Sequence, residues 1–215
     1  MMRHSTVLGC TRKGADYPDN LERFSLFCRA VMEWLVFLGE HESWYADILH
    51  LHDWQTALCA AYQKTLYQTT SAFKNLRTIL TVHNLGYQGL FPGKSFPTTG
   101  LPVQYFGPKH LEFYGSVNLL KGGLVFSDAL TTVSPTYSRE IQTKEFGFGL
   151  EGFWKSGKGF CMELSTESMT AYGIRRRIRT FATIIPWRTC LGRPAARAIS
   201  KRKLACRNKV CRCCL

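Results

Sequence analysis

Polar side chains that could bind a ligand or move a proton follow three short apolar runs of the chain. The runs cover residues 48–51, 78–82 and 130–133 and are rich in Ile, Leu, Val and Thr. Histidine and aspartate are common general acids and bases, and asparagine both donates and accepts hydrogen bonds. The polar groups that end the three runs are His52 with Asp53, His83 with Asn84, and Ser134 with Pro135.

The apolar runs have the length and composition of buried parallel strands, and helical patterns lie between them. We expect helices over residues 21–38, 55–67, 117–126 and 135–142, with Gly39 ending the first. This alternation predicts an α/β fold, a partial Rossmann-like domain whose doubly wound parallel sheet has right-handed crossovers. Ligands of such sheets bind beyond the carboxyl ends of the strands, where the polar groups fall.

The basic charge of the chain is concentrated at one end. The 215 residues carry a formal net charge of +13, but residues 1–155 hold fourteen Lys and Arg against thirteen Asp and Glu. Residues 156–215 hold fourteen basic residues against two acidic ones and six of the nine cysteines. We therefore predict a loose N-terminus over 1–13, a partial catalytic domain over 14–155, and a basic, Cys-rich, irregular tail over 156–215.

The tail has three interpretations. A change of composition near residue 155 fits a disordered segment or one translated out of frame. Its runs of basic residues at 175–177 and 201–203 could bind a polyanion or nucleic acid. The alternative function is therefore that of a basic binding protein. No known nucleic-acid-binding motif and no interleaved aromatic residues support it. Its last four cysteines, Cys206, Cys211, Cys213 and Cys214, lack the paired spacing of a zinc site, so we predict no metal.

Other sequence features bear on where the protein works. No apolar run approaches the roughly twenty residues that a membrane-spanning helix needs, and the N-terminus lacks the apolar core of a secretory signal. Cys10, Cys28 and Cys59 are scattered in the body of the chain, which is typical of a reducing compartment. We therefore expect no membrane partner and a cytoplasmic location, or a plastid if the source is a plant.

Several long motifs occur together in a fixed order. They are DYPDNLERFSLFCRA (16–30), HDWQTAL (52–58), TVHNLGYQGLFP (81–92) and NLLKGGLVFSDALTTVSPTYSREIQTKEFGFGLEG (118–152). The segment from about Gly14 to about Gly152 closely resembles bacterial glycogen synthase and plant starch synthase. The resemblance implies one of the two facing Rossmann-like domains of a glycosyltransferase, on the acceptor side of the cleft.

The resemblance also implies site residues and partners. His83 matches the histidine beside the transferred glucose, and Asp53 matches an acidic residue that shapes the same edge, so both are catalytic candidates. Asn84, Tyr87 and Gln88 match the loop that lines the cleft and are substrate-binding candidates. The implied partners are ADP-glucose as donor and an α-1,4-glucan as acceptor, and no cofactor is implied. Catalysis in the family resembles ion-pair stabilisation without a protein nucleophile.

Simpler interpretations stay open for these residues. Asp53 precedes a helix and could be only its N-cap, and His83 could be a structural histidine. His50 and His52 share a strand face at a spacing that a metal could use, but no third ligand is nearby, so packing is the better explanation. We reject a phosphate loop at Lys121 because no strand is predicted before it.

The match to the family is partial. Residues before Gly14 show no strand with the Lys-x-Gly-Gly loop, and residues after about 152 show no Asn-Gly-Ile-Asp turn or donor domain. From these departures we expect a synthase fragment with little or no activity alone.

Overall fold

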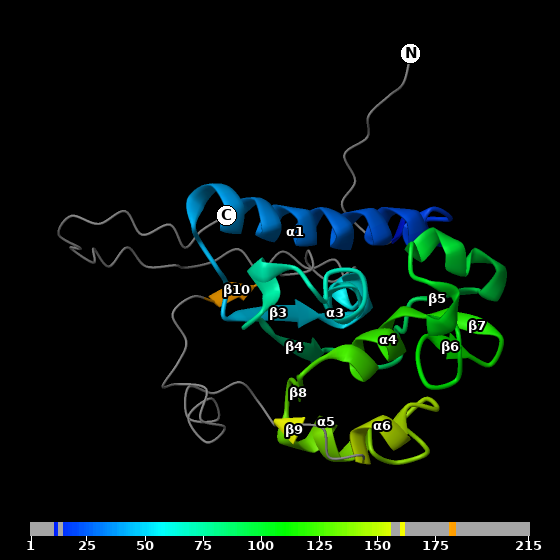
Figure 1. Ribbon diagram of the computed structural model, residues 1–215. Coiled ribbons are helices and arrows are strands. Elements are labelled where there is room, and N and C mark those ends of the chain that lie inside the picture. Colours follow the sequence, from blue (N-terminus) through cyan, green and yellow to red (C-terminus); the bar gives the residue numbers. More distant parts are fainter. Residues whose placement is uncertain (1–10, 13–14, 156–159, 162–180, 184–215) are drawn as a thin grey trace.

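A computed structural model describes residues 11–12, 15–155, 160–161 and 181–183 (Figure 1). Its centre is a five-stranded, entirely parallel sheet with the strand order β10-β3-β4-β8-β9. The strands are β3 (Ile48–His52), β4 (Arg77–Val82), β8 (Ala129–Thr132), β9 (Phe160–Cys161) and β10 (Phe181–Thr183).

The three predicted strands are confirmed as the middle of this sheet. β3 and β4 are buried along almost their whole length, and β8 is buried at three of its four residues. Strands covered on both faces favour continuous apolar and β-branched runs over alternating ones. The register pairs His52 with Thr81 and Thr81 with Thr131, so the three strands end at one edge.

Helices connect and cover the strands. Helix α1 (Asn20–Glu42) crosses the molecule above β3 and α3 in Figure 1, and its buried residues include Cys28, Met32 and Leu35. The other helices are α2 (Asp53–Thr56), α3 (Leu58–Lys64), α4 (Leu119–Phe126), α5 (Pro135–Glu140) and α6 (Glu151–Lys155), with a short 3₁₀ turn η1 (Ser71–Phe73) before β4.

The predicted boundaries of the first two helices were wrong. Gly39 does not end α1, which continues to Glu42 and ends at Ser43 in the left-handed conformation. Gly39 is needed within the helix because a Cβ there would lie 2.9 Å from the ring of Tyr45. The helix predicted over 55–67 is two helices, α2 and α3, which meet at Ala57.

The long loop after β4 contains a small antiparallel sheet that the sequence did not predict. Its strand order is β5-β7-β6, with two 3₁₀ turns between β5 and β6. Its elements are β5 (Leu90–Pro92), η2 (Gly93–Thr99), η3 (Val103–Tyr105), β6 (Glu112–Phe113) and β7 (Ser116–Asn118).

The helix predicted over 117–126 begins only at Leu119, because residues 117–118 belong to β7. Helix α4 therefore follows a strand directly, and the reason given for rejecting a phosphate loop at Lys121 was wrong. The ammonium group of Lys121 instead donates hydrogen bonds to the carbonyls of Pro108 and Glu112, so it serves the packing of this region. Asn118 caps the helix by accepting a bond from the Lys121 amide at 2.8 Å.

The two glycines of α4 allow close packing. A Cβ on Gly123 would lie 2.7 Å from the Cβ of Ala57 and 2.8 Å from a methyl of Leu80. A Cβ on Gly122 would lie 2.9 Å from Leu111. A side chain at Gly123 would therefore push α4 away from Ala57 and β4, and one at Gly122 would press on Leu111.

Few residues of the predicted tail are described. β9 extends the sheet beside β8, and β10 extends it beside β3, so these five residues are strands although we predicted none after residue 155. At the other end β1 (Thr11–Arg12) pairs with β2 (Ala15–Asp16). The basic runs and the last four cysteines lie outside the described residues. No helix among the described residues is long and apolar enough to cross a membrane.

Candidate functional site

Asp53 and His83 lie together at the carboxyl edge of the parallel sheet. Asp53 is the first residue of α2, directly after β3, and His83 directly follows β4. The Asp53 Oδ1 atom accepts a hydrogen bond from the His83 amide at 2.8 Å and lies 3.5 Å from the Asn84 amide. The sequence prediction that these side chains share one edge is therefore confirmed, while their chemical roles stay predictions.

The N-cap interpretation of Asp53 was wrong. The N-cap position of α2 belongs to His52 and carries no side-chain capping bond. Asp53 instead adopts a left-handed backbone, with φ of 55°, and turns its carboxylate to the neighbouring strand. Burial raises the pKa of this carboxyl, although the hydrogen bond from the His83 amide and the charge of His83 oppose the rise.

Three histidines form a cluster beside this carboxylate. The Nδ1 atom of His52 lies 2.9 Å from the Nε2 atom of His83, and the rings of His50 and His52 have centroids 4.2 Å apart. The Nε2 atom of His50 lies 2.7 Å from the Thr81 hydroxyl. That hydroxyl in turn lies 2.5 Å from the Thr131 hydroxyl, so a polar line crosses three strands.

The inner two histidines are neutral at physiological pH. Burial, with the charge of His83 in second place, lowers the pKa of His50 from 6.5 to about 4. Burial followed by the charges of His50 and His83 lowers the pKa of His52 to about 3. A buried imidazole disfavours its charged form, and like charges nearby add to this effect. The cluster therefore presents hydrogen-bonding rings, of which only His83 is exposed.

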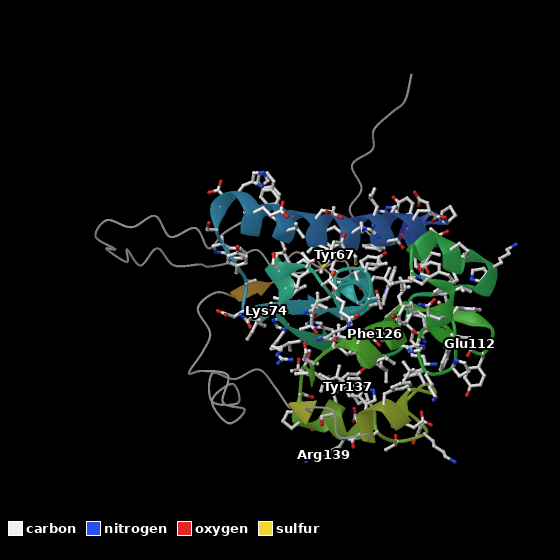
Figure 2. All side chains as sticks on the ribbon, viewed as in Figure 1. Tyr67, Lys74, Glu112, Phe126, Tyr137 and Arg139 are labelled. Carbon is white, nitrogen blue, oxygen red and sulfur yellow. The ribbon has the colours of Figure 1, made fainter. Side chains whose placement is uncertain are left out.

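The loop after His83 is held in place by its own side chains. Asn84 accepts a hydrogen bond from the Gly86 amide at 3.0 Å, which closes a tight Asx turn. The Tyr137 hydroxyl accepts one from the Leu85 amide at 2.7 Å, and Tyr137, a residue of α5, is labelled in Figure 2. Tyr87 is 66% exposed, so its ring is available to a ligand.

Gln88 differs from the other predicted binding residues because it is buried. Its amide donates to the Phe148 carbonyl at 3.2 Å and accepts from the Asn118 amide at 2.6 Å. The backbone carbonyl of Gln88 also accepts from the Leu120 amide. Gln88 therefore fixes the loop between His83 and α4, and direct ligand contact by Gln88, Asn84 or Tyr87 stays a prediction.

Sequence reasoning missed two residues of this region. We attributed His52 to packing, but its ring contacts His83 at the exposed edge. The available signal was a histidine at the end of one strand and a second histidine directly after the neighbouring strand. The sequence also gave no sign that the Tyr137 hydroxyl would accept a hydrogen bond from the Leu85 amide.

The described part of the chain contains no cluster of side chains arranged to bind a metal ion. No group of three or more His, Cys, Asp and Glu side chains that could hold a metal ion occurs there. His50, His52 and His83 bond to one another or to threonine instead of converging on one point.

Comparison with known proteins identifies the family. The family model of the starch synthase catalytic domain matches residues 4–156 of this chain. A glycogen synthase of Koribacter versatilis is 51% identical over 144 residues, which cover 67% of this chain and 29% of that protein. A glycogen synthase of Aquifex aeolicus is 49% identical over 142 residues, 66% of this chain and 29% of that protein.

A solved structure agrees with this result. The catalytic domain of starch synthase IV from Arabidopsis thaliana, bound to ADP and acarbose, superposes with a TM-score of 0.60 at 35% identity. The match covers 70% of this chain and 31% of that one. The parallel sheet is therefore the Rossmann-like sheet of this glycosyltransferase fold, and the chain spans less than a third of the length of these relatives. By the family match and the fold together, the chain belongs to the starch synthase catalytic domain family.

Proposed function

We propose that residues 14–155 form the acceptor-side domain of a glucosyltransferase that moves glucose from ADP-glucose to the non-reducing end of an α-1,4-glucan. The Asp53–His83 contact at the carboxyl edge of the sheet carries this proposal, because ligands of such sheets bind there. The ADP and acarbose of the Arabidopsis neighbour support a nucleotide sugar donor and a glucan acceptor.

In this proposal each residue has a defined task. The exposed His83 ring donates a hydrogen bond to the reacting glucosyl unit. Asp53 positions His83 by accepting a hydrogen bond from its backbone amide. Asn84 and Tyr87 contact the sugar from the loop, and Gln88 holds that loop in place.

A segment exchange tests the proposal. Residues 15–155 replace the matching segment of the Aquifex aeolicus glycogen synthase, and glucose transfer from ADP-glucose to glycogen is measured. We expect transfer that His83→Ala lowers by about 10²-fold or more, as for the loss of one transition-state hydrogen-bond donor. Trp34→Ala, on the exposed side of α1, is the matched control and should leave transfer unchanged. A folded exchange protein without transfer, or one that tolerates His83→Ala, would show the proposal to be wrong.

Two other assignments follow the same reasoning. Cys28 and Cys59 are free and buried, which supports a reducing compartment such as the bacterial cytoplasm or the plastid. The comparisons give no support to a nucleic-acid-binding function, and no observation in the described residues favours it.

A further inference from the structure

The outer edge of β3 is paired by a strand from a distant part of the chain. β10 lies parallel to β3 and pairs Phe181 with Ile48 and Thr183 with His50. Figure 1 shows β10, in orange, beside β3. On its other side β3 pairs with β4 along all five of its residues, whereas β10 contributes only three. The proposed function gives this pairing no role.

The register shows which backbone groups of β3 face β10. The Arg77 amide, at the start of β4, donates to the carbonyl of Asp47 at 2.9 Å. The backbone groups of successive strand residues point alternately to the two neighbouring strands. Residues 47, 49 and 51 therefore turn their amides and carbonyls toward β4, and Ile48, His50 and His52 turn theirs toward the outer edge.

Thr56 closes this outer edge after His50. The His52 amide donates to the Thr56 hydroxyl oxygen at 2.7 Å, and the same hydroxyl donates to the His52 carbonyl at 2.8 Å. One side chain thus uses both outward backbone groups of His52. A strand can pair along the edge only as far as His50, and β10 ends at Thr183, the partner of His50. The edge is therefore a site for a short strand of defined length.

The edge requires a strand partner because β3 is buried. Ile48 is 4% and His50 is 6% exposed, and Leu49 is fully buried. Unpaired backbone groups in such surroundings cost free energy, and an open strand edge is a template for pairing with another chain. The outward amides and carbonyls of Ile48 and His50 therefore need a strand, whichever molecule supplies it.

The connection that leads to β10 is long enough to supply this strand to a second molecule. β9 lies at the opposite edge of the sheet, four strand spacings or about 19 Å from β10. Residues 162–180 join the two strands, and a chain of that length reaches about 60 Å when extended. The length of chain before β10 thus exceeds what its own sheet demands.

A second copy of the chain offers the same edge and the same bonds. Pairing of residues 181–183 with β3 is identical within one molecule and between two, so the two forms differ chiefly in the entropy of the connection. A strand on a flexible connection has an effective concentration of about 1 mM or less at its own site. As the protein concentration approaches this value, a strand from another molecule competes, and mutual exchange gives a dimer at low cost.

We propose that the outer edge of β3 is a site of strand exchange between two copies of this chain. Residues 181–183 of each copy occupy the β3 edge of the other in the register described above, and Thr56 determines where the exchanged strand ends. The dimer contains two equivalent strand contacts. This inference does not depend on the proposed glucosyl transfer, so neither can fail because of the other.

Photo-crosslinking of isotopically mixed copies tests the exchange. The photoreactive residue p-benzoylphenylalanine replaces Ala182 in the 215-residue protein, and equal amounts of ¹⁴N and ¹⁵N protein are incubated together. A thiol reductant keeps the nine cysteines from forming disulfides between copies. Irradiation at ~10 μM to ~1 mM brackets the effective concentration, and mass spectrometry identifies crosslinks from residue 182 to residues 48–50. We expect crosslinks that join the two isotopes to rise toward about half of the total, the value for random mixing.

Two substitutions identify the contact by light scattering at ~1 mM. Ala182→Pro removes the amide that lies between Ile48 and His50, and should convert dimer to monomer. Trp34→Ala, on the exposed side of α1, should leave the dimer unchanged. Loss of the dimer through Trp34→Ala would assign the contact to α1 and overturn the proposal. Crosslinks within one isotope at every concentration would also overturn it, because each copy would then keep its own strand, and this result does not require the proline variant to fold.

Discussion

The Nδ1 atom of His52 lies 2.9 Å from the Nε2 atom of His83, and the other ring nitrogen of His52 is buried without a hydrogen-bond partner among the described residues. A buried N–H without a partner is rarer in proteins than a lone pair without one. In the neutral pair, the His52 proton is therefore on Nδ1 and is donated to His83. Neutral His83 must then carry its own proton on Nδ1.

This relationship predicts the tautomer of the candidate catalytic residue. Long-range ¹⁵N–¹H correlation spectra at pH 8 should show a protonated Nδ1 in both His52 and His83. His52→Phe removes the donor and should let His83 populate both tautomers, which a purely packing role for His52 would not produce. A wild-type spectrum with the His83 proton on Nε2 would refute the assignment.

Close packing at Gly123 leads to a second prediction. Gly123→Ala should lower the free energy of unfolding by about 1–3 kcal/mol, because the new methyl would press on Ala57 and Leu80. Gly152 is also helical, but a Cβ there would meet nothing within 4 Å outside its own helix, so Gly152→Ala should stabilise by about 0.5–1 kcal/mol. Urea unfolding measures both. Equal effects of the two substitutions would contradict the packing argument.

The sequence allowed the main sheet to be predicted because β3, β4 and β8 are buried on both faces. Such strands are unbroken apolar runs, and their polar ends mark the edge where Asp53 and His83 meet. Helix α5 was equally predictable, since Pro135 stands at its first turn and Ser134 caps it.

The other parts of the fold and of the candidate site depend on contacts between residues far apart in the sequence, which no local pattern contains. β5, β6 and β7 have two or three residues each, too few to show a period of two. β10 pairs with β3 across more than a hundred residues of sequence. The Asp53 carboxylate points away from its own helix because it accepts a hydrogen bond from the amide of His83, just after the next strand. The local sequence pattern does not contain this contact and therefore suggested only an N-cap.

The histidine cluster makes stability depend on pH. The pKa of His50 is about 4 and that of His52 about 3 in the folded protein, against 6.5 for an ordinary histidine. Between these values the unfolded chain binds protons that the folded one does not, so stability should fall as the pH is lowered from about 7 toward 4. The raised pKa of Asp53 acts in the opposite sense near the acidic end of this range.

Unfolding at pH 5 should therefore take up close to two protons at these residues, and His50→Gln should remove one of them. Glutamine can still bond to the Thr81 hydroxyl, so the fold should survive the change. Calorimetry in two buffers of different ionisation enthalpy measures the uptake. A variant that takes up as many protons as the wild type would show that His50 is not the group responsible.

Asp53 combines a strained backbone with a hydrogen bond to the next strand, and three substitutions separate the two contributions. Asp53→Asn keeps an acceptor for the His83 amide and tolerates a φ of 55°, so it should cost less than about 1 kcal/mol of unfolding free energy. Asp53→Gly loses the acceptor but relieves the backbone, and should cost about 1 kcal/mol. Asp53→Ala loses the acceptor and keeps the strain, so the cost should reach about 2–3 kcal/mol.

Urea unfolding of the three variants and of the wild type gives this order directly. The comparison of glycine with alanine is the sharpest part, because both remove the carboxylate and differ only in the backbone they accept. If Asp53→Gly is as unstable as Asp53→Ala, the left-handed backbone carries no strain and the hydrogen bond alone holds Asp53 against His83. If Asp53→Asn is the least stable of the three, the charge itself stabilises the edge, and Asp53 would have to be ionised in the folded protein despite the burial that raises its pKa.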